Sequence, residues 1–173
     1  GDVKYKDLNG DHKIDNNDVS AIGNPIYPLL TGNLSMGFSW KGLDFSMTWA
    51  GAFKTSRLVA DFYRYPFGST NNRSLLKYMI DDAWTPEKGN SAKAPAISLT
   101  NSKPNNYKDS DLWLRDASYV RLKNLEVGYS FPQGLLSKMH LSSLRISLSG
   151  YNLLTFDALG FSDPESNPSG DTY

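Results

Sequence analysis

Residues 33–50 read NLSMGFSWKGLDFSMTWA, with a large apolar residue at every second position on both sides of Lys41-Gly42. Alternation with a period of two predicts β-strands that have one apolar face and one small or polar face. A two-residue turn at Lys41-Gly42 would put all the large apolar side chains on one face, through the pairs Trp40–Leu43, Phe38–Phe45, Met36–Met47 and Leu34–Trp49. The sequence therefore predicts a hairpin over residues 32–53, although lysine is an unusual first residue for this kind of turn.

Two stretches later in the chain show the same alternation. Residues 119–131 alternate most cleanly from Leu125 onward, and residues 144–155 alternate through Leu144, Ile146 and Leu148. Residues 133–140, between them, are expected to form one or two helical turns. The predicted fold is all-β, with antiparallel strands.

Long polar segments separate and flank these strands. Residues 1–31 are rich in Asp, Asn and Gly, and residues 156–173 are rich in Pro, Gly, Ser and Asp. The connection over residues 54–118 shows one helical pattern, at residues 74–83, and no sustained strand pattern. A connection this long with so little regular structure is more often a functional loop.

Composition excludes several classes of function. The chain has 18 basic and 18 acidic side chains, so no overall basic excess favours a nucleic-acid partner. The absence of cysteine excludes thiolate metal sites and cysteine nucleophiles. His12 and His140 are far apart in the sequence, and their spacing to other residues suggests no Ser-His-Asp triad. We therefore expect that the chain is not an enzyme. No apolar run is long enough for a transmembrane helix.

The lengths of the connections alternate as they do in outer-membrane β-barrels: a tight turn is followed by a long connection and then by a fairly short turn. Each expected strand has about 10 to 13 residues, close to the 9 to 11 that cross a bilayer at a tilt. Aromatic residues near the strand ends would suit interfacial girdles: Trp40, Trp49, Tyr129, Phe131 and Tyr151. A soluble antiparallel sheet with a one-sided core has the same period. The pattern alone leaves both interpretations open.

Residues 7–18, DLNGDHKIDNND, match the spacing of a twelve-residue calcium loop. Side-chain oxygens fall at the ligand positions, and one position contributes a backbone carbonyl: the expected ligands are Asp7, Asn9, Asp11, Asp15 and Asp18, with the carbonyl of Lys13. Four carboxylates packed this closely would repel one another without a cation. We therefore expect a structural Ca²⁺ ion.

Two positions depart from the calcium-loop pattern. His12 stands where glycine normally allows a sharp turn, and Asp18 stands where a glutamate normally binds through both oxygens. The second departure is common in dockerin-like modules, which this segment resembles. The alternative is a surface turn rich in Asp and Asn, held by bonds from side chains to the backbone.

Four segments, in this order, resemble the C-terminal part of the SusC/RagA family of TonB-linked outer-membrane transporters. They are GDVKYKDLNGDHKID at residues 1–15, IGNP at 22–25 with KGLD at 41–44, LWLRDASYVRLKNL at 112–125 and LRISLSGYNLLT at 144–155. Together they cover nearly the whole chain apart from the long connection.

The resemblance implies that the chain is a fragment of a large transmembrane β-barrel whose plug domain and closing strand lie outside it. It also implies an outer-membrane location, with residues 41–42 and 132–142 as periplasmic turns. The expected division is then a calcium-loop-bearing extracellular segment (1–31), a barrel hairpin (32–53), a long extracellular loop (54–118), two barrel strands with a periplasmic turn (119–155) and the start of the last extracellular loop (156–173).

Family members import glycans, peptides or other oligomers together with a SusD-like surface lipoprotein, and TonB supplies the energy. The resemblance implies that residues 62–106 and the terminal loop contact the lid or the substrate. The side chains expected to meet membrane lipid are Leu34, Met36, Phe38, Leu43, Phe45, Met47, Leu144, Ile146 and Leu148. Those expected to line the lumen are Ser35, Ser39, Asp44, Ser46, Thr48, Glu126, Ser147 and Ser149. The alternative function is a soluble, calcium-stabilised β-rich binding module, for example for carbohydrate.

Overall fold

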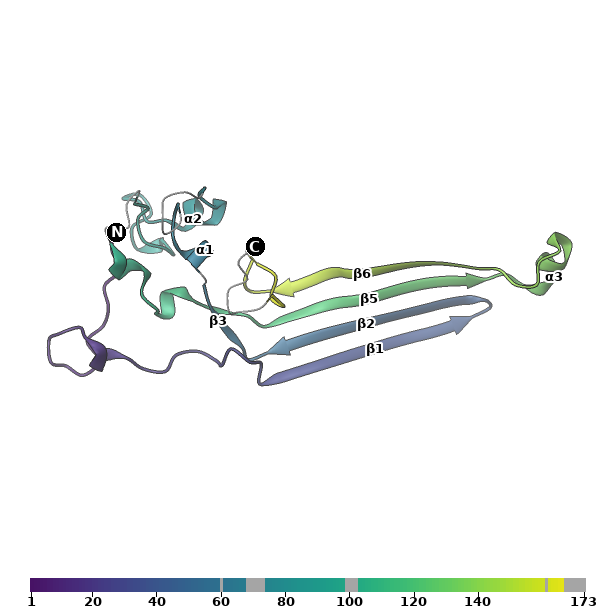
Figure 1. Ribbon diagram of the computed structural model, residues 1–173, viewed down its shortest axis with the longest axis horizontal. Helices are drawn as coiled ribbons and strands as arrows, with labels where there is room; N and C mark the ends of the chain where they lie inside the picture. The colour runs from purple at the N-terminus through teal and green to yellow at the C-terminus, as the bar shows by residue number, and fades with distance from the viewer. Residues whose placement is uncertain (60, 68–73, 99–102, 161, 167–173) are drawn as a thin grey trace. The chain divides into compact units, whose positions relative to one another are not determined.

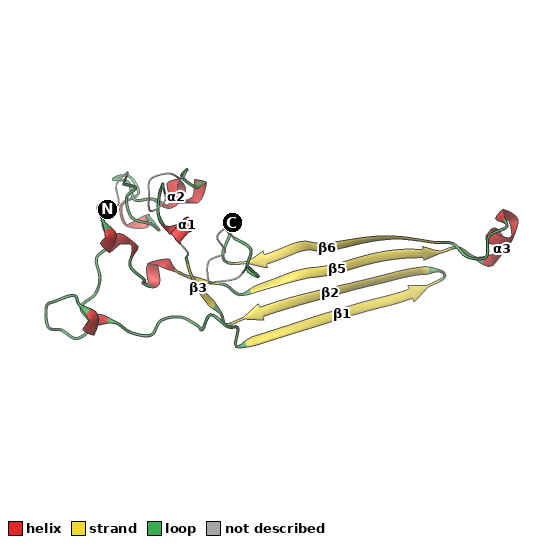
Figure 2. Cartoon of the chain, in the orientation of Figure 1, coloured by secondary structure: helices red, strands yellow, loops and turns green. Residues whose placement is uncertain are grey.

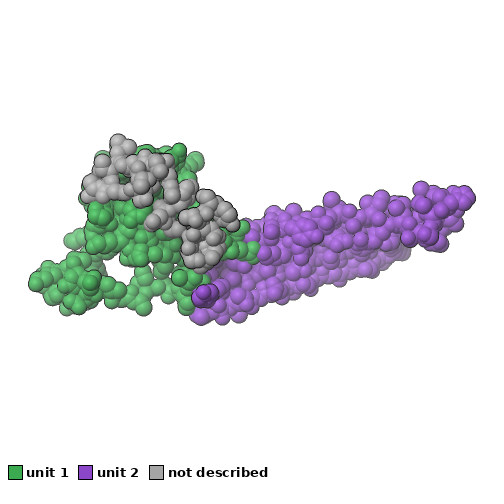
Figure 3. Space-filling model, viewed as in Figure 1, with its two compact units in different colours: residues 1–26, 56–116, 161–173 green, residues 27–55, 117–160 purple. Residues whose placement is uncertain are grey.

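The computed structural model describes residues 1–59, 61–67, 74–98, 103–160 and 162–166 (Figure 1). Its residues divide into two compact units, coloured separately in Figure 3. Unit 1 comprises residues 1–26, 56–116 and 161–173, and unit 2 comprises residues 27–55 and 117–160. Among the described residues, no helix has the length and apolar character needed to cross a membrane.

Unit 2 is built on a four-stranded antiparallel sheet with the order β1-β2-β5-β6 (Figure 2). Its strands are β1 (Leu30–Trp40), β2 (Leu43–Phe53), β5 (Tyr119–Ser130) and β6 (Arg145–Asp157). The four pairs predicted for the first hairpin are confirmed: Trp40 with Leu43, Phe38 with Phe45, Met36 with Met47 and Leu34 with Trp49. The alternation, together with a two-residue turn at Lys41-Gly42, was therefore sufficient to predict this register.

The turn between β1 and β2 has a positive φ at both central residues, 48° at Lys41 and 88° at Gly42. Two left-handed residues are the mark of a type I′ turn, whose twist matches that of the flanking strands. A Cβ atom on Gly42 would lie 2.5 Å from the carbonyl oxygen of Ser130, so glycine is required there on two counts. Lys41 accepts the strained conformation, and its ammonium lies 4.8 Å from the centre of the Trp40 ring.

A β-bulge interrupts β5 at Lys123, and the registers with β2 and with β6 both pass from Leu122 to Asn124. Leu122 pairs with Trp49 and Asn124 pairs with Thr48, so the strand gains one residue relative to β2. The extra residue resets the alternation. Leu122 and Leu125 consequently share the apolar face despite their odd spacing, and this explains why the pattern is clean only from Leu125 onward.

The turn between β5 and β6 carries α3 (Gln133–Leu136) and the 3₁₀ turn η5 (Ser137–Met139), so the expected helical turns are present. Leu136 is fully buried, and the backbone N–H of Leu141 donates to its carbonyl. His140 ends η5 in the left-handed conformation. This turn is longer than the one at Lys41-Gly42, and contacts within the turn stabilise it.

Unit 1 contains a two-stranded sheet of β3 (Ser56–Leu58) and β4 (Leu114–Asp116), which the sequence pattern did not reveal. Its helices are short: α1 (Asp61–Arg64), α2 (Lys77–Asp82) and the 3₁₀ turns η1 (Asn16–Asp18), η2 (Gly89–Ser91), η3 (Pro104–Tyr107) and η4 (Asp111–Trp113). Helix α2 begins at Lys77 rather than at the expected residue 74, because Leu76 is extended, with φ −84° and ψ 146°.

Candidate functional site

The four-stranded sheet has one polar face, and its register brings together the side chains expected to line a lumen. Ser35 pairs with Thr48 and Ser39 pairs with Asp44, while Ser46 pairs with Glu126, which in turn pairs with Ser149. Directly paired residues share a face. The hydroxyls of Ser35 and Thr48 lie 3.1 Å apart and hydrogen-bond across the hairpin.

A three-strand ion cluster lies on this polar face. Arg145 on β6 donates through Nη2 to Oδ2 of Asp44 on β2 and to Oε1 of Glu126 on β5, each at 2.6 Å. The three side chains meet above Gly128, where a Cβ atom would lie 2.5 Å from Oδ2 of Asp44 and would also collide with the Arg145 guanidinium. Sequence reasoning put both acids on this face but missed Arg145, which the register brings beside them.

The opposite face of the sheet is apolar, and many of its large side chains are exposed, above all on β1 and β6. Leu34 is 56% exposed, Phe38 55% and Leu148 79%. The face also carries aromatic stacks: the Phe38 and Phe45 rings are 5.4 Å apart, and the Trp49 and Phe156 rings 6.3 Å apart. The residues expected to meet lipid share this face, although Leu144 lies one residue before β6 begins. An exposed apolar surface of this extent marks a site of interaction with a partner or a membrane.

The segment proposed as a calcium loop is closed by its own carboxylates. Asp7 accepts the backbone N–H groups of Gly10 and His12, at 2.6 and 2.8 Å. Asp18 accepts those of Leu8 and Asp15, at 2.8 and 2.9 Å. The hydrogen bond from the backbone of Asp15, followed by that from Leu8, lowers the pKa of the Asp18 carboxyl below its usual range.

His12 adopts a positive φ of 64°, so it takes the conformation that glycine usually supplies at this position of a calcium loop. The oxygens of Asn9 and Asp11 accept the backbone N–H groups two residues further on, at 2.9 and 2.8 Å. These are the bonds expected of a surface turn rich in Asp and Asn. Within the described ranges, no three His, Cys, Asp or Glu side chains are grouped so as to hold a metal ion. The Ca²⁺ site stays a prediction.

Unit 1 has a small aromatic core that the sequence did not reveal. Val59, Tyr107 and Trp113 form the buried cluster. The side chain of Arg64, 7% exposed, donates to the carbonyls of Val59 and Tyr107 at 3.1 and 2.8 Å and pairs with Asp109 at 2.7 Å. Burying a guanidinium is tolerated because its donors are satisfied. Arg64 therefore ties distant parts of the long connection together.

The start of the chain is attached to this connection. Oδ1 of Asn106, a residue that is 1% exposed, accepts the backbone N–H of Val3 at 2.8 Å. Asp2 accepts from Lys103 at 2.9 Å and from the Asn106 amide at 3.0 Å. The Lys103 hydrogen bond, followed by that of Asn106, lowers the pKa of the Asp2 carboxyl. Segments a hundred residues apart in the sequence thus form one body.

The chain is similar in sequence to known proteins of one type. No family model matches the chain. "TonB-dependent receptor P3" of Formosa agariphila is 30% identical over 99% of the chain and 16% of its own length. "TonB-dependent receptor P26" of the same organism is 29% identical over 98% of the chain and 17% of its own length. The expected resemblance to SusC/RagA-type TonB-dependent receptors is confirmed.

Solved structures of this receptor type agree with the sequence relatives. The RagAB peptide importer in its 'open-open' state superposes with a TM-score of 0.66 at 25% identity, over 90% of the chain and 16% of the importer chain. In its 'closed-closed' state the TM-score is 0.67. The antiparallel sheet is thus an arrangement found in TonB-dependent receptors of the RagA kind, and the chain spans 16–17% of the curated relatives described above. Those relatives are named as receptors and importers.

Proposed function

We propose that this chain forms four neighbouring strands and the adjoining loops of an outer-membrane β-barrel in a TonB-dependent nutrient importer. The observation that carries the proposal is the division of the sheet into a polar face with an ion cluster and an apolar face with many exposed large side chains. Barrel strands alternate in this way between lumen and lipid. A soluble binding module, the alternative, would need a layer over the apolar face.

The proposed topology puts the Lys41-Gly42 turn and the α3–η5 turn in the periplasm and the long connection outside the cell. Lys93 in the connection and Lys138 in the α3–η5 turn are both exposed, and the chain has no cysteine of its own. In a cysteine-free full-length receptor on intact cells, a membrane-impermeant maleimide should label Lys93→Cys and leave Lys138→Cys unlabelled. Labelling of both, or only of Lys138→Cys, would refute the topology.

We also propose that the importer works with a SusD-like surface lipoprotein and carries an oligomeric substrate such as peptides or glycans, with TonB engaged through regions outside residues 1–173. The support is the similarity to RagAB, which is described as a peptide importer. Residues 62–106 and the terminal loop are the proposed contacts for the lid or the substrate; residues 68–73, 99–102, 161 and 167–173 of these segments lie outside the described residues. Replacing residues 74–98 by a short glycine-serine linker should abolish co-purification of the lipoprotein while the barrel still forms.

Calcium binding by residues 7–18 is proposed from the ligand spacing and the left-handed His12. Binding requires the carboxylates of Asp7, Asp11 and Asp18 to converge on the ion. Calorimetry on the full-length receptor should show a higher melting temperature with Ca²⁺ than with a chelator. Asp11→Ala should remove that difference, and the exposed Asp109→Ala should preserve it. Identical melts with and without the ion would eliminate the site.

A further inference from the structure

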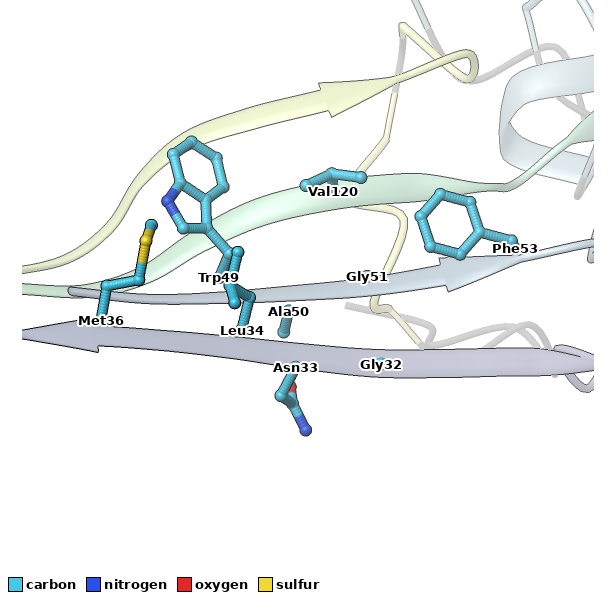
Figure 4. Close-up of a pocket in the computed structure, with 9 residues that line it drawn as sticks. All are labelled: Gly32, Asn33, Leu34, Met36, Trp49, Ala50, Gly51, Phe53 and Val120. Atoms are coloured by element: carbon cyan, nitrogen blue, oxygen red, sulfur yellow. The ribbon is translucent and has the colours of Figure 1, made fainter.

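A groove lies on the apolar face of the four-stranded sheet, at the ends of β1 and β2 that adjoin the long segments rather than the tight turn (Figure 4). Its volume is about 470 Å³. Gly32 and Gly51 are register partners and form its floor. Trp49 and Leu34 stand at one end, Phe53 stands at the other, and Val120 borders the side.

The glycines create this groove. A Cβ atom on Gly32 would meet nothing within 4 Å, so the space above it is open. A Cβ atom on Gly51 would lie 3.0 Å from the Phe53 ring, which leans over that glycine. Large side chains occupy the equivalent face positions farther along the hairpin, at the pairs Met36–Met47 and Phe38–Phe45. The surface is therefore hollowed where both partners lack a side chain.

The chemistry of the lining selects a hydrocarbon ligand. No charged residue lines the groove, and the side chain of Asn33 points to the opposite face of the sheet. The volume lies within the range of small-molecule sites, roughly 300–1,000 Å³. A charged or peptide-like group would lose its hydration here without gaining a hydrogen bond in return.

The barrel topology determines what can cover the groove. A strand added at the free edge of β1 pairs in the plane of the sheet, so it leaves the face open. The polar face, with the Arg145 cluster, is the side suited to the lumen, so the face with the groove meets lipid. We propose that this groove binds one acyl chain of a membrane lipid; the inference rests on the proposed barrel function.

The test uses the full-length receptor in nanodiscs that contain phosphatidylethanolamine with a diazirine on its acyl chain. After irradiation, mass spectrometry maps the lipid adducts along the apolar face. Adducts should concentrate on the groove-lining residues of β1 and β2. Gly32→Leu, which fills the open space, should lower that yield several-fold, and Leu34→Ala, which removes a wall, should lower it as well. Gly134→Leu in α3 is the matched control, because a Cβ atom there also meets nothing within 4 Å.

Each contrary result has a separate meaning. Adducts spread evenly along the face and unchanged by Gly32→Leu would overturn the groove proposal and leave the barrel proposal standing. A groove protected from the lipid probe while Phe38 is labelled would also overturn it, because a protein segment would then be the occupant. Absence of adducts from the whole face, Leu148 included, would refute the barrel proposal itself. Heat-modifiable migration on gels confirms that each variant forms a barrel.

Discussion

Arg145 on β6 reaches across the intervening strand to Asp44 on β2, with 2.6 Å between Nη2 and Oδ2. The two residues lie on strands that are not neighbours in the sheet, and the path between their side chains passes over Gly128 on β5. The contact links three strands through side chains rather than through backbone hydrogen bonds. It also gives the polar face a charged end beside the Lys41-Gly42 turn.

Gly128→Val should destabilise the barrel, because the new side chain would occupy the space where Arg145 meets Asp44. Overpacking of a filled site costs about 1–3 kcal/mol. Urea-dependent unfolding of the full-length barrel in lipid measures the change. Gly32→Val adds the same side chain to a strand site where a Cβ meets nothing within 4 Å, and it should cost clearly less. An equal loss in both variants would contradict the prediction.

Arginine substitutions on adjacent residues test which face meets lipid. Phe45 lies on the apolar face and Ser46 on the polar face. Phe45 lies close to the Lys41-Gly42 turn, so Phe45→Arg should cost less than the roughly 2–4 kcal/mol of a midplane site, but clearly more than Ser46→Arg. Refolding of the full barrel into vesicles gives both free energies. Similar values for the two variants would refute the assignment of faces.

Arg64→Ala should loosen the long connection, because its guanidinium holds the backbone carbonyls of Val59 and Tyr107. Hydrogen bonds to charged groups are worth roughly 1.5–3 kcal/mol each. Hydrogen exchange around Trp113 should accelerate in this variant. Asp109→Ala removes only a partner whose side chain is 73% exposed, so we expect an effect of about 0–1 kcal/mol. If Asp109→Ala accelerates exchange as strongly, the ion pair and not the backbone contact is the anchor.

Acidification should release the start of the chain. The folded pKa of Asp2 lies below its ordinary value of 3.8, so its contribution to stability is present above that value and is lost as the pH falls through the lower folded pKa. Pepsin digestion of the full-length receptor between pH 5 and pH 2 should show cleavage near residues 1–6 increasing in this window. Asp2→Asn should be cleaved readily across the whole range. A wild-type profile that tracks the variant at every pH would contradict the prediction.

The hairpin could be predicted because its information is local. Apolar residues at every second position specify both the strands and their faces, and the two-residue turn selects the register among those that keep the apolar residues together. The strained turn residue Lys41 did not prevent this, since the glycine that follows it and the paired strands fix the turn. The bulge at Lys123 had no such local signal, because it depends on how β5 pairs with both neighbouring strands.

The candidate metal loop and the anchoring contacts show the same difference. The spacing of the residues from Asp7 to Asp18 could be recognised directly. The same pattern shows that His12 stands at a position that requires a left-handed backbone conformation. No spacing rule links Arg64 to Tyr107 or Asp2 to Lys103, because these pairs are distant in the sequence and meet only when the long connection folds. Predicting such contacts requires the path of the chain between them.

The sequence by itself determined the all-β class, the faces of the hairpin strands and the resemblance to TonB-dependent receptors, because alternation and short motifs act over a few residues. The tertiary structure alone decided that Arg145 bridges Asp44 and Glu126, and that Gly32 and Gly51 open a groove between Trp49 and Phe53. These features arise from residues on different strands, so they exist only after the register of the sheet has brought those residues together.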